Sequence, residues 1–352
     1  MFTGKLWPVH PHPYQDELLS SWLVRIAHAN GEKVQSFCHH EFGQKHQIWN
    51  RDIDRLAPDW LLTKLCEKTA TPIERVRQTT LKRYEGILFD HTALSGVEKW
   101  ITPLRIYHRT RKSHGLQFCP ECLKEGNEPY FRTQWRIAFH TFCPKHNVMM
   151  HDRCPCCGEP VVFQRIELGK GNEETACDKP LSTCFNCGFD LADSKPEKAI
   201  FWNNDTSARW GQLLSGIQEN KLTRYQSEQL AVLHQFVKLL CSKVVSEKLF
   251  DFMESKFRMV LERPNFGLRH FEANDIIRRF GIIQCAWWLL SEWPNNLKGA
   301  WLDGAVRYNH LLKDFDGMPD WYLREVGNMN INYKRREMLK TLLMNTNTSE
   351  KK

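Results

Sequence analysis

Apolar residues in the first part of the chain recur at helical spacing. In the stretch DELLSSWLVRIAHANG, residues 16–31, Leu18, Trp22 and Ile26 fall on one face of a helix. Asp16 is a candidate cap for the start of this helix, and Gly31 is a candidate stop. The pattern predicts an amphipathic helix that packs on a core.

A second stretch, APDWLLTKLCEKTATPIERVRQTTLKR, predicts two short helices joined by a break at residues 69–71. Thr71, Pro72 and Glu74 have the order of an N-cap, a first-turn proline and a capping-box partner. This outline fits a helix-turn-helix, but it also fits an ordinary helical hairpin. In the first case, the residues that would face DNA bases are Arg75, Gln78 and Lys82.

Residues 200–343 again favour helices. In ANDIIRRFGIIQCAWWLLSEWP we expect core positions at Ile277, Ile282, Trp287 and Leu290. The later stretch GAVRYNHLLKDFDGMPDWYLREVG has a helix, a turn that contains glycine, and a helix that begins at a proline. It is a second candidate for a helix-turn-helix-like unit.

A basic segment, KWITPLRIYHRTRKSH, lies between the first helical part and a cysteine-rich block. It has five lysines and arginines and no acidic residue. Two interpretations stay open: a strap that contacts phosphates and a solvated linker between domains. The phosphate contacts in the first interpretation would be Arg105, Arg109, Arg111 and Lys112.

The overall composition is ordinary, and only its cysteines add to the predicted helical fold. The 352 residues are 41% hydrophobic and 26% charged, which is ordinary for a globular protein. We see no secretory signal at the N-terminus and no apolar run that could span a bilayer, so we expect a cytoplasmic protein without a membrane partner. Thiols stay reduced in the cytosol, so the 13 cysteines point to metal ligation rather than disulfides.

Nine of these cysteines lie in residues 116–195, and eight residues there form paired half-sites. FCPEC and FCPKH supply the first set, in which a proline after the first cysteine stiffens each turn. CPCCG and CFNCG supply the second set, in which a glycine follows the second ligand. The first set is Cys119, Cys122, Cys143 and His146, and the second is Cys154, Cys157, Cys184 and Cys187.

Four soft ligands are what a structural Zn²⁺ ion requires, so we expect two such ions. We prefer this sequential pairing of half-sites, and a cross-braced pairing of the first half-site with the third is the alternative. Full ligand sets leave no open position for water, which argues against a catalytic metal. Cys156 and Cys177 would be spare thiols. Cys38, Cys66, Cys241 and Cys285 look like small buried hydrophobes.

Four nearby histidines do not match a metal motif, and surface or core roles are the better interpretation of His10, His12, His39 and His40. The sequence also has no phosphate-binding loop, nucleophile elbow or dinucleotide fingerprint, so we expect no enzyme activity. The net charge of +8 would fall to about +5 with two zinc ions bound, which is compatible with a polyanionic partner.

The chain resembles the TniQ/TnsD family of transposon target selectors over nearly its full length. The resemblance begins at HPYQDELLSSWLVRIAHANG and continues through RDIDRLAPDWL and TATPIERVRQTTL. It is most specific at LQFCPECLKEGNEPYFRTQWRIAFHTFCPKHNVMMHDRCPCCGEPV and CFNCGFDL, and it returns at AWWLLSEWP, YNHLLKDF and MPDWYL.

This resemblance implies a zinc-containing adaptor that marks an insertion site and recruits the AAA+ ATPase of a transposon. It also implies two ways of marking the site: reading duplex DNA, or docking, as a possible homodimer, on an RNA-guided Cascade complex. The chain is shorter than family members with long C-terminal extensions that read DNA. Two other functions remain candidates: a docking scaffold that never reads DNA by itself, and a free-standing transcription regulator.

These observations predict a mainly α fold with five segments. They are a helical helix-turn-helix domain at 1–98, a basic linker at 99–115, a tandem zinc-ribbon or zinc-knuckle block at 116–195, a helical domain at 196–343 and a disordered tail at 344–352.

Overall fold

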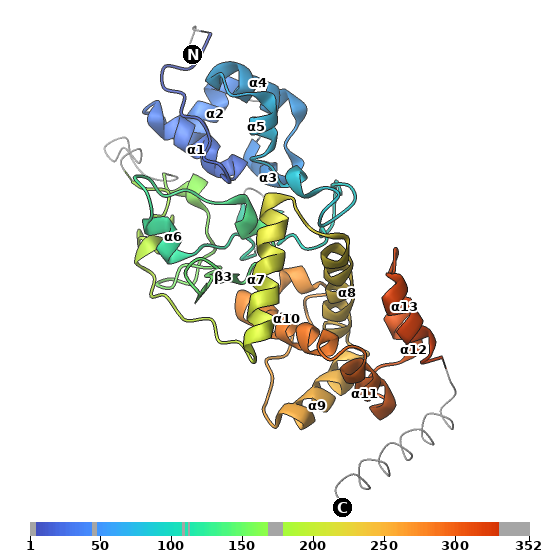
Figure 1. Cartoon of the computed structure of the whole chain (residues 1–352). Coiled ribbons are helices and arrows are strands. Elements are labelled where there is room, and N and C mark those ends of the chain that lie inside the picture. Colours follow the sequence, from blue (N-terminus) through green and yellow to red (C-terminus); the bar gives the residue numbers. More distant parts are fainter. Residues whose placement is uncertain (1–4, 44–47, 108–109, 112, 168–178, 331–352) are drawn as a thin grey trace, which may run out of the picture. The chain divides into compact units, whose positions relative to one another are not determined.

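The computed structural model describes residues 5–43, 48–107, 110–111, 113–167 and 179–330, with no account of the side chains of residues 107–111. The fold is mainly helical, as the sequence predicts (Figure 1). The chain forms two compact units, residues 1–200 and residues 201–352. We describe each unit by itself.

The first unit begins with short helices around one central helix, α1. Every residue of α1 from Leu19 to Ala27 is buried, because α2, α3 and η4 all contact it. The elements of this part are α1 (Leu19–Ala29), α2 (Val34–Phe42), η1 (Ile48–Asn50), α3 (Ile53–Leu56), α4 (Asp59–Thr69), α5 (Ile73–Arg77) and η2 (Leu81–Tyr84).

The predicted caps of these helices are partly wrong. Helix α1 begins at Leu19, and no side chain caps it, because the Asp16 carboxylate binds Arg132 instead. The predicted stop is correct, since Asn30 ends the helix and Gly31 follows with a φ of 71°.

The two helices predicted at residues 57–83 are α4 and α5. They contact each other across a turn in which Ala70 has a left-handed φ of 52°. No capping box forms, since Pro72 occupies the N-cap of α5. The Thr71 hydroxyl instead accepts a hydrogen bond from Thr69 and lies 2.8 Å from His12 Nδ1.

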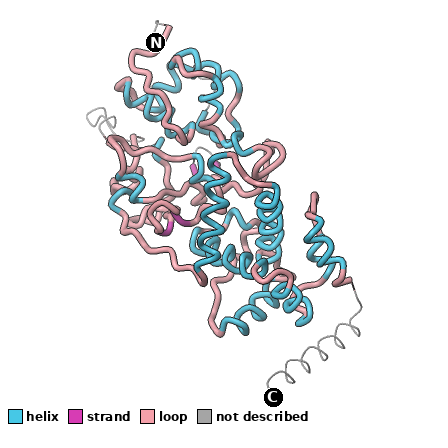
Figure 2. Tube along the Cα trace, viewed as in Figure 1, coloured by secondary structure: helices cyan, strands magenta, loops and turns pink. Residues whose placement is uncertain are grey.

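Loops make up most of the remainder of the first unit (Figure 2). The two small sheets are antiparallel hairpins, in which Ile106 pairs with Arg111 and Phe142 pairs with Met149. The elements are β1 (Ile106–Tyr107), β2 (Thr110–Arg111), α6 (Pro120–Lys124), η3 (Thr133–Arg136), β3 (Phe142–Cys143), β4 (Val148–Met149), η4 (Phe163–Arg165) and η6 (Leu191–Asp193).

The second unit is helical and is centred on the contact between α8 and α10. Side-chain caps fix three helix starts, at Asn203, Thr223 and Asp275. The elements are α7 (Asn204–Glu219), α8 (Arg224–Leu240), α9 (Ser246–Phe257), η7 (Phe271–Ala273), α10 (Ile276–Leu290), α11 (Asn295–Asp303), α12 (Tyr308–Leu312) and α13 (Asp320–Gly327).

Three of the four predicted core positions on α10 are correct, since Ile282, Trp287 and Leu290 are buried. The prediction for Ile277 is wrong, because its side chain is 53% exposed. It lies in the first turn of α10, one turn before Gly281, which Glu262 approaches.

The late glycine-containing stretch forms α12 and α13, which contact each other. The turn between them includes Gly317 with a φ of 66°. The predicted boundaries at residues 98 and 115 lie inside the first unit, and the boundary at residue 195 lies close to its end. The predicted tail at 344–352 lies outside the described residues.

Candidate metal centres

The first candidate metal centre is built from a helix start and a hairpin. Pro120 begins α6 directly after Cys119, so the backbone turns and the Cys119 carbonyl accepts from Leu123 N at 3.1 Å. Cys143 ends β3, and Asn147 adopts a φ of 53° in the turn that leads to β4. This turn brings His146 back beside the three cysteines.

The ligand atoms of this centre are spaced for a tetrahedral ion. His146 Nδ1 lies 3.4 Å from Cys119 Sγ and 3.5 Å from Cys143 Sγ. Cys122 Sγ lies 3.7 Å from Cys143 Sγ, and all four atoms lie within 4.8 Å of one another. Zinc–sulfur bonds of about 2.3 Å give sulfur–sulfur edges of about 3.8 Å in a tetrahedron. The donor set and its spacing therefore fit zinc.

Glu125 orients the histidine of this centre. Its Oε1 atom lies 3.0 Å from His146 Nε2, on the ring edge opposite Nδ1. A carboxylate at this place holds the proton on Nε2 and leaves the Nδ1 lone pair for a metal. The ammonium group of Lys145, 2.6 Å away, and then His146 hold the pKa of Glu125 below its usual value.

The second candidate centre consists of two copies of the same turn. Gly158 N donates to the carbonyl of Cys154 at 2.9 Å, and Gly188 N donates to the carbonyl of Cys184 at 3.0 Å. Both glycines have a positive φ, 75° and 78°, which a residue with a side chain rarely adopts. The parallel predicted from the two glycines is therefore present in the backbone.

The four sulfurs of the second centre also have tetrahedral spacing. Cys154 Sγ lies 3.6 Å from Cys187 Sγ, and Cys157 Sγ lies 3.7 Å from Cys184 Sγ. Cys154 and Cys184 are buried, whereas Cys187 is exposed. Together the two centres have the grouping of the sequential pairing, and the cross-braced alternative does not describe this structure.

The other cysteines are outside these groups. Cys38, Cys241 and Cys285 are buried as expected, and Cys66 is half-buried. Burial raises the pKa of the Cys38 thiol to about 12, so it stays protonated. Cys156 is exposed, and Cys177 lies outside the described residues.

The four candidate surface or core histidines lie away from both centres. His10 Nδ1 lies 2.8 Å from the carbonyl of Trp7, and His40 Nδ1 lies 3.1 Å from Glu32. Among the described residues, the two cysteine-rich groups are the sets that could hold a metal ion.

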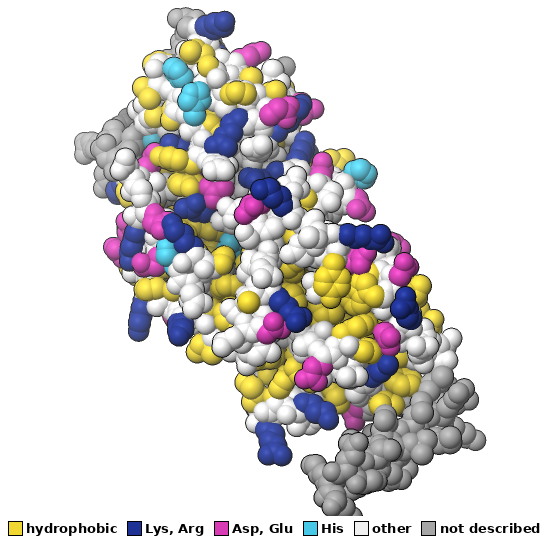
Figure 3. All heavy atoms as spheres, viewed as in Figure 1, with side chains coloured by type: hydrophobic (Ala, Val, Ile, Leu, Met, Phe, Trp, Pro, Cys, Tyr) yellow, Lys and Arg dark blue, Asp and Glu magenta, His cyan; other side chains and the backbone are white. Residues whose placement is uncertain are grey.

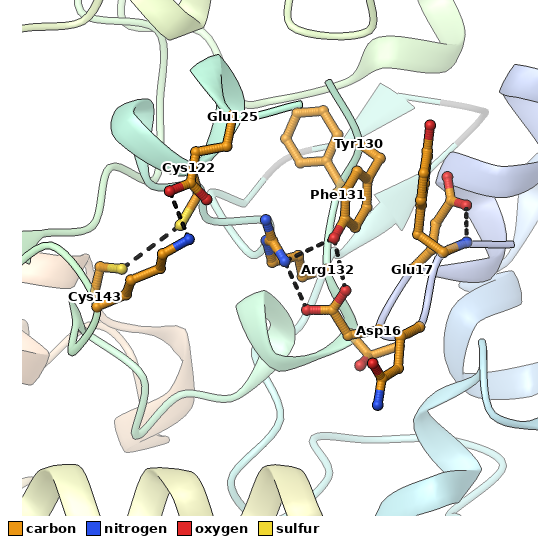
Figure 4. Close-up of polar contacts among 12 residues, drawn as sticks. Asp16, Glu17, Cys122, Glu125, Tyr130, Phe131, Arg132 and Cys143 are labelled. Carbon is orange, nitrogen blue, oxygen red and sulfur yellow. Dashed lines mark hydrogen bonds and ion pairs between the residues drawn. The ribbon is translucent and has the colours of Figure 1, made fainter. Parts of the chain in front are cut away.

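A loop of the first centre enters the helical part of the same unit. Tyr130, Phe131 and Arg132 lie between the ligands Cys122 and Cys143 in sequence, and Figure 4 shows them beside Asp16 and Glu17. Arg132 lies 2.9 Å from the Asp16 carboxylate, and the Tyr130 hydroxyl donates to the same group at 2.9 Å. Aromatic residues of the same loop pack on other parts of the unit: Phe131 stacks on Phe163 of η4 at 4.6 Å, and Phe139 packs edge-on against Trp100 at 5.2 Å.

Arg136 is the deepest member of this loop. Its side chain has no exposed surface and lies 2.6 Å from Asp52 and 3.2 Å from Asp54. Asp52 also caps α3, and Asp54 accepts from Ser20 of α1. A buried arginine between two carboxylates therefore joins the loop between Cys122 and Cys143 to helices α1 and α3.

The sequence alone did not identify Glu125, Arg132 and Arg136 as residues that position the candidate metal centre. The available signal was the two arginines four residues apart in an otherwise aromatic stretch, FRTQWRIAF. Charged side chains inside an apolar segment are buried only when partners neutralise them. The partners, however, lie about 80 to 116 residues away in sequence, where no local pattern can identify them.

The residues predicted to contact nucleic acid lie in two parts of the first unit, the segment of α5 and η2 and the basic segment. Arg75 donates to the carbonyls of Pro13 and Gln15, and Lys82 donates to the carbonyl of Ala57. Gln78 follows the last residue of α5 and is exposed.

In the basic segment, Arg105 is exposed and Arg111 lies on β2, but its side chain is not described. Arg109 and Lys112 lie outside the described residues.

The family model TniQ matches residues 8–150 of the chain. This range contains α1, the α4–α5 pair, Arg136 and the whole first centre, and it ends before Cys154. No curated protein matches the chain. Among the described residues, no helix has both the length and the apolar character needed to cross a membrane.

Proposed function

We propose that the chain is a non-catalytic adaptor that selects target sites for DNA transposition, because residues 8–150 match the TniQ family model. The observation that carries the proposal is the family match over the same residues that build the first metal centre. Two structural zinc ions would hold the loop-rich part of the first unit, since such segments depend on metal for folding.

As an adaptor, the chain would mark an insertion site and recruit the AAA+ ATPase of its transposon. A test is to express it together with the transposase and ATPase encoded beside it and to map the insertions. We expect insertions at one site with the wild type and scattered or absent insertions with Cys119→Ser. Insertions at the same site without this chain would contradict the proposal, and a gene neighbourhood without these partners would favour a transcription regulator.

The contacts of α5 and η2 favour docking over direct reading of bases. Arg75 and Lys82 already bind backbone carbonyls of their own unit, so reading bases would cost these hydrogen bonds. On the face shown in Figure 3, basic and acidic side chains are interspersed rather than gathered in a basic stripe. We therefore propose that another component, such as an RNA-guided Cascade complex, reads the sequence, and that this chain docks on it.

Selection of duplexes from a genomic fragment pool by the purified protein, at moderate salt, separates the two modes. We expect binding without sequence preference. Enrichment of one sequence would overturn the docking mode and assign the reading to this chain.

A further inference from the structure

A pocket of about 500 Å³ lies in the first unit, away from both metal centres. One wall is the segment from η1 to α3, and the other is the loop at 94–106. Three arginines line it: Arg51, Arg55 and Arg105. None of them is a metal ligand or part of the α4–α5 pair.

The arginines of this pocket have unused hydrogen-bond donors. The Arg55 guanidinium donates through one terminal nitrogen to the Gly96 carbonyl at 2.9 Å, while its buried Nε has no hydrogen-bond partner among the residues that the structure describes. Arg51 and Arg105 are exposed at the pocket. A guanidinium offers five donors in a fixed fork, which suits the oxygens of a phosphate.

The carboxylates of the same pocket are already engaged. Asp52 lies 2.6 Å from the buried Arg136, and Glu98 accepts from the backbone N of Ala93 at 2.7 Å. Both carboxylates therefore have partners within the first unit, and the exposed charged side chains of the pocket are those of Arg51 and Arg105.

Two further features concern the rim. Arg105 has a φ of 44°, a left-handed conformation that is uncommon for residues other than glycine, and such positions are frequent at ligand sites. Leu94 is 87% exposed and offers an apolar contact next to the basic side chains. A sugar phosphate fits this pocket: its phosphate would contact the arginines, and the C–H groups of its sugar would contact the Leu94 side chain.

We propose that this pocket binds phosphate groups of a duplex DNA backbone near the insertion site. The inference rests on the proposed function and adds to it a contact that positions the chain on DNA without reading bases.

The first test adds a charge rather than removing one, so it does not depend on loss of folding. Leu94→Lys places a cation on the rim, and Val260→Lys, at an equally exposed apolar position of the second unit, is its matched control. With a duplex of about 30 base pairs, we expect Leu94→Lys to steepen the plot of log affinity against log salt by about 0.9. Equal slopes for the two variants would overturn the proposal.

The second test removes the pocket cations. The double variant Arg51→Gln, Arg105→Gly should flatten the same slope by about two units and weaken duplex binding about tenfold or more at low salt. The glycine also relieves the left-handed backbone, so the melting temperature and the zinc content should not fall. Arg224→Gln removes an 88% exposed arginine of the second unit and should leave the slope unchanged.

Two other probes identify the source of the phosphate. If the double variant weakens only a single-stranded RNA of the same length, the assignment to duplex DNA is wrong. If pyrophosphate raises the melting temperature of the wild type but not of the double variant, while duplex binding is unchanged, the pocket holds a free anion and the proposal fails.

Failure here is distinguishable from failure of the proposed function. If the pocket variants have the salt slope of the wild type and the wild type directs insertions to one site, phosphate binding at the pocket is rejected and the adaptor function is retained. Insertions at the same site without this chain would reject the adaptor, whatever the slopes are.

Discussion

Glu125 shows how a residue that is not a ligand can control a metal centre. Its carboxylate holds the Nε2 edge of His146, so we expect Glu125→Ala to weaken zinc binding by about 10-fold to 100-fold. Competition with a coloured chelator measures this affinity. Glu121→Ala is the control, since Glu121 lies on α6, close to Glu125 in sequence, and pairs with Lys124. Equal affinities for the two variants would show that His146 needs no orienting partner.

Arg136 illustrates a different effect, the cost of an unpaired buried charge. Arg136→Met leaves Asp52 and Asp54 without their cation, so we expect a loss of about 3 to 5 kcal/mol in the free energy of unfolding. Arg77→Met removes an exposed ion pair and should cost no more than about 1 kcal/mol. Urea denaturation of the zinc-loaded chain compares them, and similar losses would contradict the role of burial.

Glu17 is a buried acid with a predictable pH dependence. Burial raises its pKa from 4.5 to about 7, although Arg25 lies 2.6 Å away and acts in the opposite direction. The native state therefore holds the proton more tightly than the unfolded state. Its contribution to stability is complete below pH 4.5 and is lost as the pH rises through 7.

We expect the stability of the wild type, relative to Glu17→Gln, to fall between pH 5 and pH 8 by no more than about 3 kcal/mol. Thermal melting of both proteins across this range measures the difference. A difference that does not change with pH would show that Glu17 stays ionised in the native state.

At the scale of elements, the two metal centres support different amounts of structure. The loop of the first centre inserts Arg132 and Arg136 among the helices, whereas the second centre joins two turns near the end of the unit. We expect Cys119→Ser to raise hydrogen exchange in α1 and α3, and Cys187→Ser to raise it only around residues 152–193. Equal effects of both variants on α1 would contradict this difference.

The elements also show what the sequence can predict. Local spacing identified the paired half-sites of both candidate centres, the stop at Gly31 and most of the α10 core, because each depends on residues a few positions apart. It failed at Asp16 and Thr71, where distant partners, Arg132 and His12, occupy the expected capping groups. It also failed to find Glu125 as the partner of His146, because the two lie 21 residues apart and meet only after the loop has closed.

For the whole molecule, the division into two units predicts two unfolding transitions. Both candidate metal centres lie in the first unit, and the described residues of the second unit include no group that could hold a metal ion. Calorimetry of the full chain should show that a zinc chelator lowers one transition by many degrees and leaves the other in place. A single transition that shifts as a whole would mean that the two units unfold together.

The position of Arg136 also has a consequence for synthesis. Asp52 and Asp54 leave the ribosome more than 80 residues before the arginine that neutralises them. The first helices therefore emerge before the guanidinium that contacts these two carboxylates in the folded unit. Only when the chain has grown past His146 can the loop close on a metal and deliver the guanidinium. We therefore expect the nascent helices to stay incompletely packed until this later segment, which could hold a metal ion, has been translated.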